Sequence, residues 1–177
     1  FIYGGFTGRS CSEEGDCVEG DAEELKELRY GQSGARFTGA EGHADVELAT
    51  SAHGRLELNL VADVVRARFD DGGDVPRIPP WHLGAGLSWE AERFDASLSL
   101  RYAASQDRYG EFDTPTPSYT DVGAQVGWRP FLSQPGVEFA LVGSNLGDSL
   151  QRNAVSINRE VAPQPGRNVR LMFSARF

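Results

Sequence analysis

Residues 167–177, RNVRLMFSARF, alternate apolar and polar side chains with a period of two. One face takes Val169, Leu171, Phe173, Ala175 and Phe177, and the other takes Arg170, Met172, Ser174 and Arg176. Alternation sustained over so many residues predicts a β-strand with one apolar face. The strand ends on an aromatic residue, whereas the last residues of most soluble domains are loosely ordered.

The same alternation recurs along most of the chain, which predicts a protein built almost entirely of strands. It is clearest in residues 55–64 (RLELNLVADV), 81–90 (WHLGAGLSWE), 93–102 (RFDASLSLRY), 121–129 (DVGAQVGWR) and 137–145 (VEFALVGSN). A further segment alternates from Ala40 to Leu48 and loses phase between Phe37 and Gly39. That loss of phase predicts a β-bulge at Phe37–Gly39.

Composition narrows the possible functions. The 177 residues carry a net charge of −9, which disfavours nucleic acid as a partner because phosphate binding needs clustered Lys and Arg. No run approaches 18 apolar residues, so we expect no transmembrane helix. The sequence has no HExxH, nucleophile elbow or phosphate-binding loop, so we expect no enzyme activity and no cofactor.

The apolar stretches have a common length. They run over residues 56–64, 81–89, 94–102 and 169–177, nine residues each. Nine residues of a tilted strand rise roughly 20–25 Å, the height of the hydrocarbon layer that a membrane barrel covers. Aromatic residues stand at the ends of three of these stretches, where a barrel presents its aromatic girdles.

The connections between the strands alternate in length. Residues 51–54, 90–92 and 132–136 are short links, while 9–24, 70–79, 105–117 and 147–166 are long, charged or rich in Pro and Gly. Outer-membrane barrels have short periplasmic turns and long extracellular loops. The sequence therefore predicts an all-β fold: an antiparallel transmembrane β-barrel segment of about eight strands, including one that opens the chain at FIYGGFTG.

Two other architectures fit part of the pattern. A complete eight-stranded outer-membrane barrel with a structural or adhesive role fits the length, because eight strands can close around a filled interior. Its interior charges would have to form a tight network, whereas the polar face here is thinned by glycines. A soluble β-sandwich that binds a ligand would require the aromatic girdles to be accidental.

Four stretches carry a family resemblance: RYGQSGARFTGAEGHADVEL, VPRIPPWHLGAGLSWE, ALVGSNLGDSLQRNA and VAPQPGRNVRLMFSARF. In this order they resemble the C-terminal end of a TonB-dependent outer-membrane receptor, and the first and last are most similar to the zinc-uptake subgroup. The most specific marks are Arg36-x-x-Gly39-x-Glu41, Asn145-Leu146 and Pro165-Gly166-Arg167. The sequence departs from the family at Gly147, where an aromatic residue usually follows Asn-Leu.

The resemblance implies that residues 1–177 are the C-terminal part of a larger barrel, without its plug domain and N-terminal strands. It implies import of a scarce nutrient across the bacterial outer membrane, with zinc or another metal ion as first choice and a metal chelate such as a siderophore as second. The implied partners are outer-membrane lipid, the plug and through it TonB, and the transported metal. A terminal Phe177 resembles the signal by which the barrel-assembly machinery recognises its clients.

The first long link contains two cysteines and many carboxylates. Cys11 and Cys17 lie close together in a polar segment, which predicts a disulfide formed in an oxidising compartment. The acidic residues are Glu13, Glu14, Asp16, Glu19, Asp21, Glu23 and Glu24. So much negative charge would concentrate cations at an extracellular loop, although such a loop also serves simply as a solvated surface.

The polar faces of the strands supply the remaining candidates. The residues expected to face the lumen are Glu41, His43, Asp45, Glu47 and His82. The carboxylates around His43 could hold a divalent cation, but pairing with cations of a plug is the favoured interpretation. His82 is expected to contact the lumen or the plug, because no second metal ligand lies at a suitable spacing.

Overall fold

The computed structural model describes residues 2–11, 17–19, 25–110, 113–131 and 136–176, with side chains from Tyr30 onward. The strands are β1 (Ile2–Cys11), β2 (Cys17–Glu19), β3 (Leu25–Gln32), β4 (Ala35–Ser51), β5 (Gly54–Phe69), β6 (His82–Glu90), β7 (Phe94–Ala103), β8 (Tyr119–Trp128), β9 (Glu138–Ser144) and β10 (Asn168–Ser174). No helix in this part of the chain is long and apolar enough to cross a membrane.

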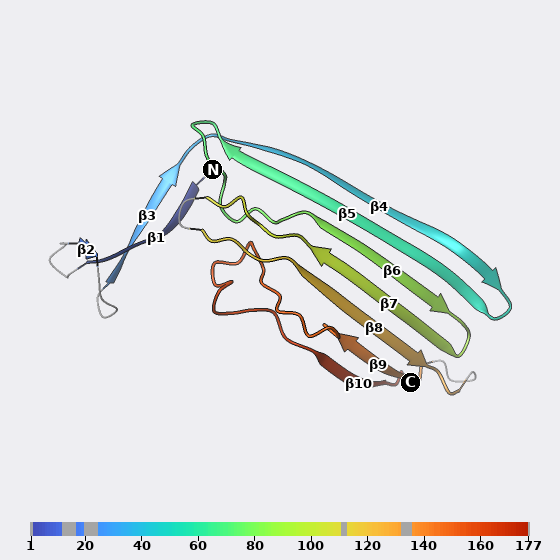
Figure 1. The fold of residues 1–177 in the computed structure, drawn as a ribbon. Coiled ribbons are helices and arrows are strands. Elements are labelled where there is room, and N and C mark those ends of the chain that lie inside the picture. The colour runs from blue at the N-terminus through green and yellow to red at the C-terminus, as the bar shows by residue number, and fades with distance from the viewer. Residues whose placement is uncertain (1, 12–16, 20–24, 111–112, 132–135, 177) are drawn as a thin grey trace.

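Seven strands form one antiparallel sheet in the order β10-β9-β8-β7-β6-β5-β4, so each strand pairs with its neighbours in the chain (Figure 1). A meander of this kind needs only short connections, since consecutive antiparallel strands lie side by side. The sheet agrees with the predicted all-β, antiparallel class.

The first strand does not belong to this sheet, in contrast to the expected arrangement. β1 pairs with β2 and β3 in a separate three-stranded sheet, from Ile2 opposite Gln32 to Cys11 opposite Leu25. The predicted long link 9–24 is therefore strand in part. Because β3 is followed almost at once by β4, the small sheet extends from the N-terminal end of β4 (Figure 1).

The bulge predicted at Phe37–Gly39 is also in the wrong place. Pairing of β4 with β5 is continuous from Ala35 opposite Phe69 to Glu47 opposite Glu57, and the register shifts between Glu47 and Ala49. The extra residue is Leu48. The apolar stretches of the strands together form a band across the sheet, called the apolar band below. The mixed pattern at Phe37–Gly39 arises because this end of β4 lies beyond that band, where polar side chains occur on both faces of the strand.

The register aligns the apolar faces of the strands across the sheet. Leu58 lies opposite Leu87, Leu87 opposite Leu98, and Leu98 opposite Ala124. At the other edge, Leu141 lies opposite Leu171 and Phe139 opposite Phe173. Since alternate residues of a strand share a face, the predicted apolar stretches form one continuous surface.

This surface is not covered by protein. Leu98 is 53% exposed, Leu171 76% and Phe173 64%. The buried apolar side chains among the described residues are Ala67, Val75, Ala103, Ala104, Ala140 and Ala154. So small a buried set, next to so large an exposed apolar face, fits a sheet whose outer surface meets lipid.

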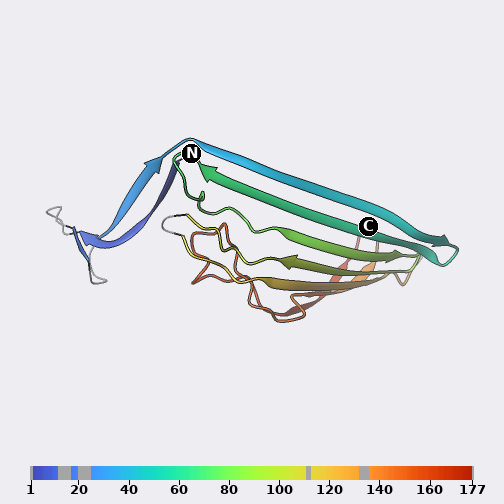
Figure 2. The same cartoon turned by 45° about the horizontal axis from the view of Figure 1, so that its top comes forward.

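The short connections lie at one end of the sheet and the long connections at the other, as predicted. The turns after β4, β6 and β8 lie at one end, and the segments 70–81, 104–118 and 145–167 gather at the other (Figures 1 and 2). The first turn needs Gly54, whose φ is 132° and whose missing Cβ would lie 2.5 Å from the Glu90 carbonyl oxygen. His53 also lies in this turn, where its backbone N–H donates to Ser51 Oγ.

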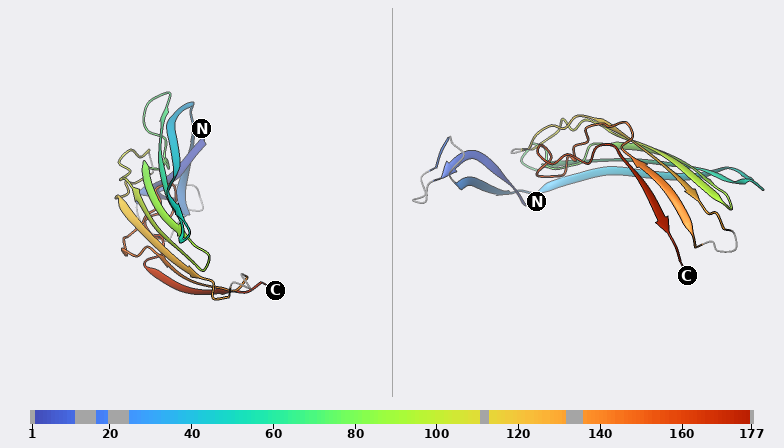
Figure 3. Two further views of the ribbon diagram at one scale, coloured as in Figure 1. Left: turned by 90° about the vertical axis from the view of Figure 1, so that its right-hand side faces the viewer. Right: turned by 90° about the horizontal axis from the view of Figure 1, so that it is seen from below.

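The sheet curves around an arc from β4 to β10 without closing (Figure 3). In the described part of the chain β4 and β10 are its two edges and do not pair with each other. The seven described strands of this sheet therefore do not close into a small barrel by themselves.

We expect Leu98→Arg to destabilise the folded sheet in lipid by about 2–4 kcal/mol, because it places a charge at the middle of the apolar face. Urea unfolding of the protein in lipid vesicles measures this. Ser97→Arg is the matched control, since Ser97 is the preceding residue of β7 and lies on the polar face. Equal losses for the two variants would contradict the assignment of faces.

Candidate functional site

The five residues expected on the polar face do share one face. Glu41, His43, Asp45 and Glu47 occupy alternate positions of β4, opposite residues 63, 61, 59 and 57 of β5. His82 lies at the start of β6, opposite Asp63. That this face lines a lumen stays a prediction.

Four carboxylates of this face, Asp45, Glu47, Glu57 and Asp63, are paired within the chain. His82 Nδ1 lies 2.9 Å from Asp63 Oδ1, and Asn59 donates to Asp45 Oδ1 at 2.6 Å. Arg55 bridges Glu47 at 3.2 Å and Glu57 at 2.6 Å. Within the described ranges no three His, Cys, Asp or Glu side chains come together in a way that would hold a metal ion. The row around His43 is therefore not an assembled cation site.

A cavity of about 470 Å³ lies where the segment 145–167 folds onto the loop-bearing end of the polar face. The sheet contributes His82, Arg101 and Asp121, and the segment contributes Gln151 and Arg152. Gln151 is buried and donates from Nε2 to Asp121 Oδ1 at 3.1 Å. The Nε of Arg152 is buried without a hydrogen-bond partner among the described residues, so this cavity holds unused donor capacity.

The base of the segment 145–167 is held by Asn145. Its φ is 47°, a conformation that Asn tolerates better than most residues. The side chain donates to the Ser149 carbonyl at 2.9 Å and to the Pro165 carbonyl at 3.2 Å, and accepts from Ser149 N–H at 3.0 Å. Two motifs twenty residues apart thus meet in space. Gly147 faces open space, so the loop base does not depend on an aromatic residue there.

Like the Asn145 hydrogen bonds, an ion pair acts as a clamp on the loops, and it joins all three long ones. Arg159 forms an ion pair with Asp113, and both side chains are at least nine-tenths buried. Asp113 Oδ2 also accepts from the backbone N–H of Arg77 at 2.9 Å. Residues 70–81, 104–118 and 145–167 therefore converge on one carboxylate. Burial lowers the pKa of Arg159, Arg77 lowers it further, and Glu160 opposes the shift.

Of the acidic candidates, the structure describes only the backbone of Glu19, in β2. Glu13, Glu14, Asp16, Asp21, Glu23 and Glu24 lie outside the described residues, as does Phe177. Cys11 and Cys17 are direct partners in the β1–β2 register. Opposite residues of antiparallel strands have Cα atoms about 4.5–5.5 Å apart, within the range of a disulfide, which remains a prediction.

The sequence interpretation missed most of the residues that build the cavity and the clamps. Arg101 and Asp121 are register partners on the polar face, so the period of two contains the signal that would have found them. Asp113 and Arg159 lie in irregular segments far apart in the sequence, and no local pattern links them. Long-range contacts between loops are set by tertiary packing alone.

We expect Arg159→Met to loosen the three loops without unfolding the sheet, because it leaves the Asp113 carboxylate buried and unpaired, at a local cost of about 3–5 kcal/mol. Limited proteolysis of the folded protein measures this as faster cleavage in residues 104–118 and 145–167. Glu160→Gln, which changes the exposed neighbouring residue, is the control. Equal cleavage of wild type and Arg159→Met would refute the clamp.

Comparison with known proteins identifies the architecture. The solved structure of a protein described as "Copper transporter OprC" superposes with a TM-score of 0.75 at 18% sequence identity. The match covers 86% of this chain and 25% of that one, so this chain spans about a quarter of its length. The family model described as "TonB dependent receptor-like, beta-barrel" matches residues 2–146. The chain therefore belongs to the TonB-dependent receptor-like β-barrel family.

Proposed function

We propose that this chain is part of an outer-membrane transporter that imports a scarce nutrient, a metal ion or metal chelate, with energy relayed by TonB. Family membership supports the class of protein. The uncovered apolar face supports a location in the outer membrane, because β-barrels are one of the two structures that span lipid and an exposed apolar surface of this size needs cover. Family and structural neighbour are receptors and transporters rather than enzymes.

We infer that these strands belong to a larger barrel. The sheet has two edges, β4 and β10, and open edges do not occur in hydrocarbon because their backbone groups would lack partners. Other strands of the same protein would pair with both edges. A plug domain, lying against the polar face, would belong to that larger protein. This favours the transporter over the closed eight-stranded barrel.

The observation that carries the import proposal is the cavity of about 470 Å³ over the polar face. It offers two guanidinium groups, a carboxylate, an imidazole and three side-chain amides in one place. Such a mixed set suits a ligand with anionic oxygens around its metal better than a bare cation, which would be repelled by Arg101 and Arg152. We therefore rank a metal chelate above a free metal ion for this cavity.

Zinc as cargo rests on the sequence resemblance and on the acidic residues near Cys11. The structural neighbour is described as a copper transporter, but at 18% identity the similarity supports only the fold. Neither ion is favoured by the described residues. The cargo is therefore decided by uptake measurements on a panel of metals and chelates.

The remaining partners follow from the same proposal. Outer-membrane lipid would cover the apolar face, and the plug would contact Glu41, His43 and the other lumen-facing residues. TonB would act through the plug. Phe177, the last residue of the alternating sequence 169–177, would present the signal for the barrel-assembly machinery.

The intact mass of the native polypeptide in an outer-membrane preparation tests the larger barrel. We expect a mass several times the 19.3 kDa of this chain, because both sheet edges need partners. A mass near 19.3 kDa would mean a self-contained protein, and the transport proposal would have to be abandoned.

Uptake by cells that depend on this protein tests the cavity. We expect the double substitution Arg101→Gln with Asp121→Asn to reduce uptake of the cargo about tenfold or more, since charge-assisted hydrogen bonds are each worth about 1.5–3 kcal/mol. The panel contains zinc, copper and ferric chelates, and collapse of the proton gradient should abolish uptake. Gln125→Ala, on the same face of β8, is the control. Unchanged uptake of every cargo in the double variant would refute the assignment.

A further inference from the structure

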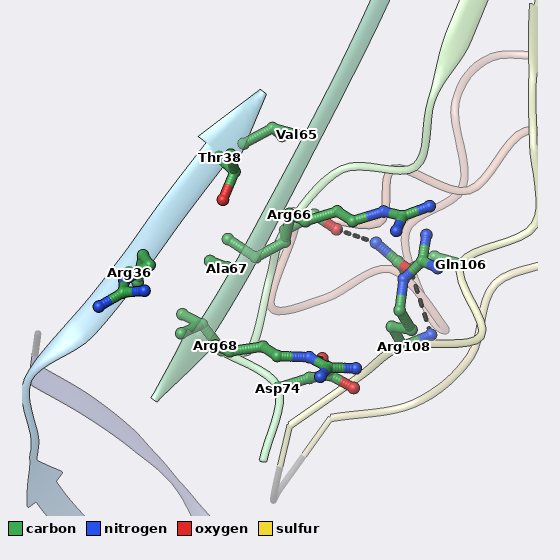
Figure 4. A pocket seen from close by; sticks show the side chains of 11 residues that line it. Arg36, Thr38, Val65, Arg66, Ala67, Arg68, Asp74, Gln106 and Arg108 are labelled. Atoms are coloured by element: carbon green, nitrogen blue, oxygen red, sulfur yellow. Dashed lines mark hydrogen bonds and ion pairs between the residues drawn. The ribbon is translucent and has the colours of Figure 1, made fainter. Parts of the chain in front are cut away.

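A second cavity, of about 320 Å³, lies between the loop-bearing end of β5 and the segments 70–81 and 104–118. Its lining includes four arginines, Arg36, Arg66, Arg68 and Arg108. Arg66 and Arg68 extend from β5 toward Gln106 and Arg108 (Figure 4). None of these side chains belongs to the polar-face cavity described above.

The charge of this cavity is poorly balanced. Asp74 is the one carboxylate in its lining, and four guanidinium groups against one carboxylate leave a net charge of +3. Arg68 Nε lies 3.5 Å from Asp74 Oδ1. Among the described residues no carboxylate pairs with Arg36, Arg66 or Arg108. Clustered like charges are unfavourable unless an anion joins them, so in a chain of net charge −9 this arrangement points to an anionic ligand.

The wall opposite β5 is held firmly in place. Gln106 is 5% exposed; its side chain donates to the Ile78 carbonyl at 2.5 Å and accepts from Arg108 N–H at 3.1 Å. Val75 is fully buried and donates its backbone N–H to the Ala67 carbonyl at 3.2 Å. The backbone that carries Arg108 is thus fixed facing Arg66. The four arginines are exposed, so their guanidinium groups can reach a ligand from fixed backbone positions.

The register places three of these arginines directly beyond the apolar band. Ala40 lies opposite Val64, Thr38 opposite Arg66, and Arg36 opposite Arg68. Because alternate residues share a face, Arg66 and Arg68 continue the face of Val64 and Ala62. They are the first charged side chains on the outward face toward the long loops. If the apolar band spans the hydrocarbon, they stand at the level of the outer-leaflet headgroups.

We propose that Arg36, Arg66, Arg68 and Arg108 bind the phosphate group of an outer-leaflet lipid. The planar fork of arginine matches phosphate bidentately, and an outward-facing site at headgroup depth meets lipid before it meets any soluble anion. The proposal rests on the membrane location proposed above. It requires no transport activity, so the two can be tested apart.

The test measures lipid binding rather than uptake. Wild type and the double variant Arg66→Gln with Arg108→Gln are purified in detergent, and binding of a diphosphorylated outer-membrane glycolipid is compared with that of its dephosphorylated form. We expect wild type to prefer the phosphorylated form and the double variant to bind it about tenfold or more weakly. Arg93→Gln, an exposed arginine in the turn at the opposite end of the sheet, should bind like wild type.

Two further arms keep the test decisive. Arg66→Lys retains the charge and should restore part of the binding, which a purely structural role of Arg66 would not predict. Inorganic phosphate alone is titrated in parallel; arginine-dependent binding of free phosphate without any preference for the phosphorylated lipid would overturn the lipid assignment. So would equal lipid binding by wild type and the double variant. Lipid binding without uptake would refute only the transport proposal.

Discussion

The apolar face of the seven-stranded sheet has no protein layer to pack against in the described part of the chain. Its leucines and aromatic residues stay exposed, and the buried apolar side chains are five alanines and one valine. Such a surface is unstable in water, because exposed apolar area costs free energy in proportion to its size. Lipid removes that cost, and then every backbone group in the hydrocarbon must be paired within the sheet. The antiparallel meander supplies that pairing everywhere except at β4 and β10.

The loops follow from the same constraint. Each loop buries one small apolar side chain, Val75, Ala104 or Ala154, and polar contacts do the rest. These are the Asn145 amide at the base of the last loop and the Asp113–Arg159 pair between three loops. Hydrogen bonds and buried ion pairs are directional, so they set loop positions more sharply than apolar contacts would. The result is an ordered cover over the polar face, and the cavity that carries the import proposal exists because of it.

The charged side chains differ between the two faces of the sheet and along the length of the strands. The polar face of β4 and β5 carries Glu47, Asp45 and Asp63, which are paired with Arg55, Asn59 and His82 respectively. The outer face carries no charge along the apolar band and then arginines directly beyond it. Under the proposals above, the polar face would meet water or a plug, the apolar band hydrocarbon, and the arginines anionic headgroups.

Local pattern determined the strands, their faces and the alternation of short turns with long loops. The period of two reports which side chains share a face. Glu41, His43, Asp45, Glu47 and His82 do share one, because a strand that contributes to an apolar surface needs its other face for its polar residues. Beyond the apolar band the two faces no longer differ in polarity, so the alternation is lost without any bulge. This explains why the bulge was expected at Phe37–Gly39, whereas the register shifts at Leu48.

Only the tertiary structure decided where β1 pairs, which loops meet, and that the sheet stays open. Asp113 and Arg159 lie in irregular segments, and Arg108, which lies in an irregular segment as well, lines the same cavity as Arg66 of β5. Contacts between irregular segments that are distant in the sequence form only when tertiary packing brings the segments together. The local conformational preference of a residue does not specify which distant residue it will contact.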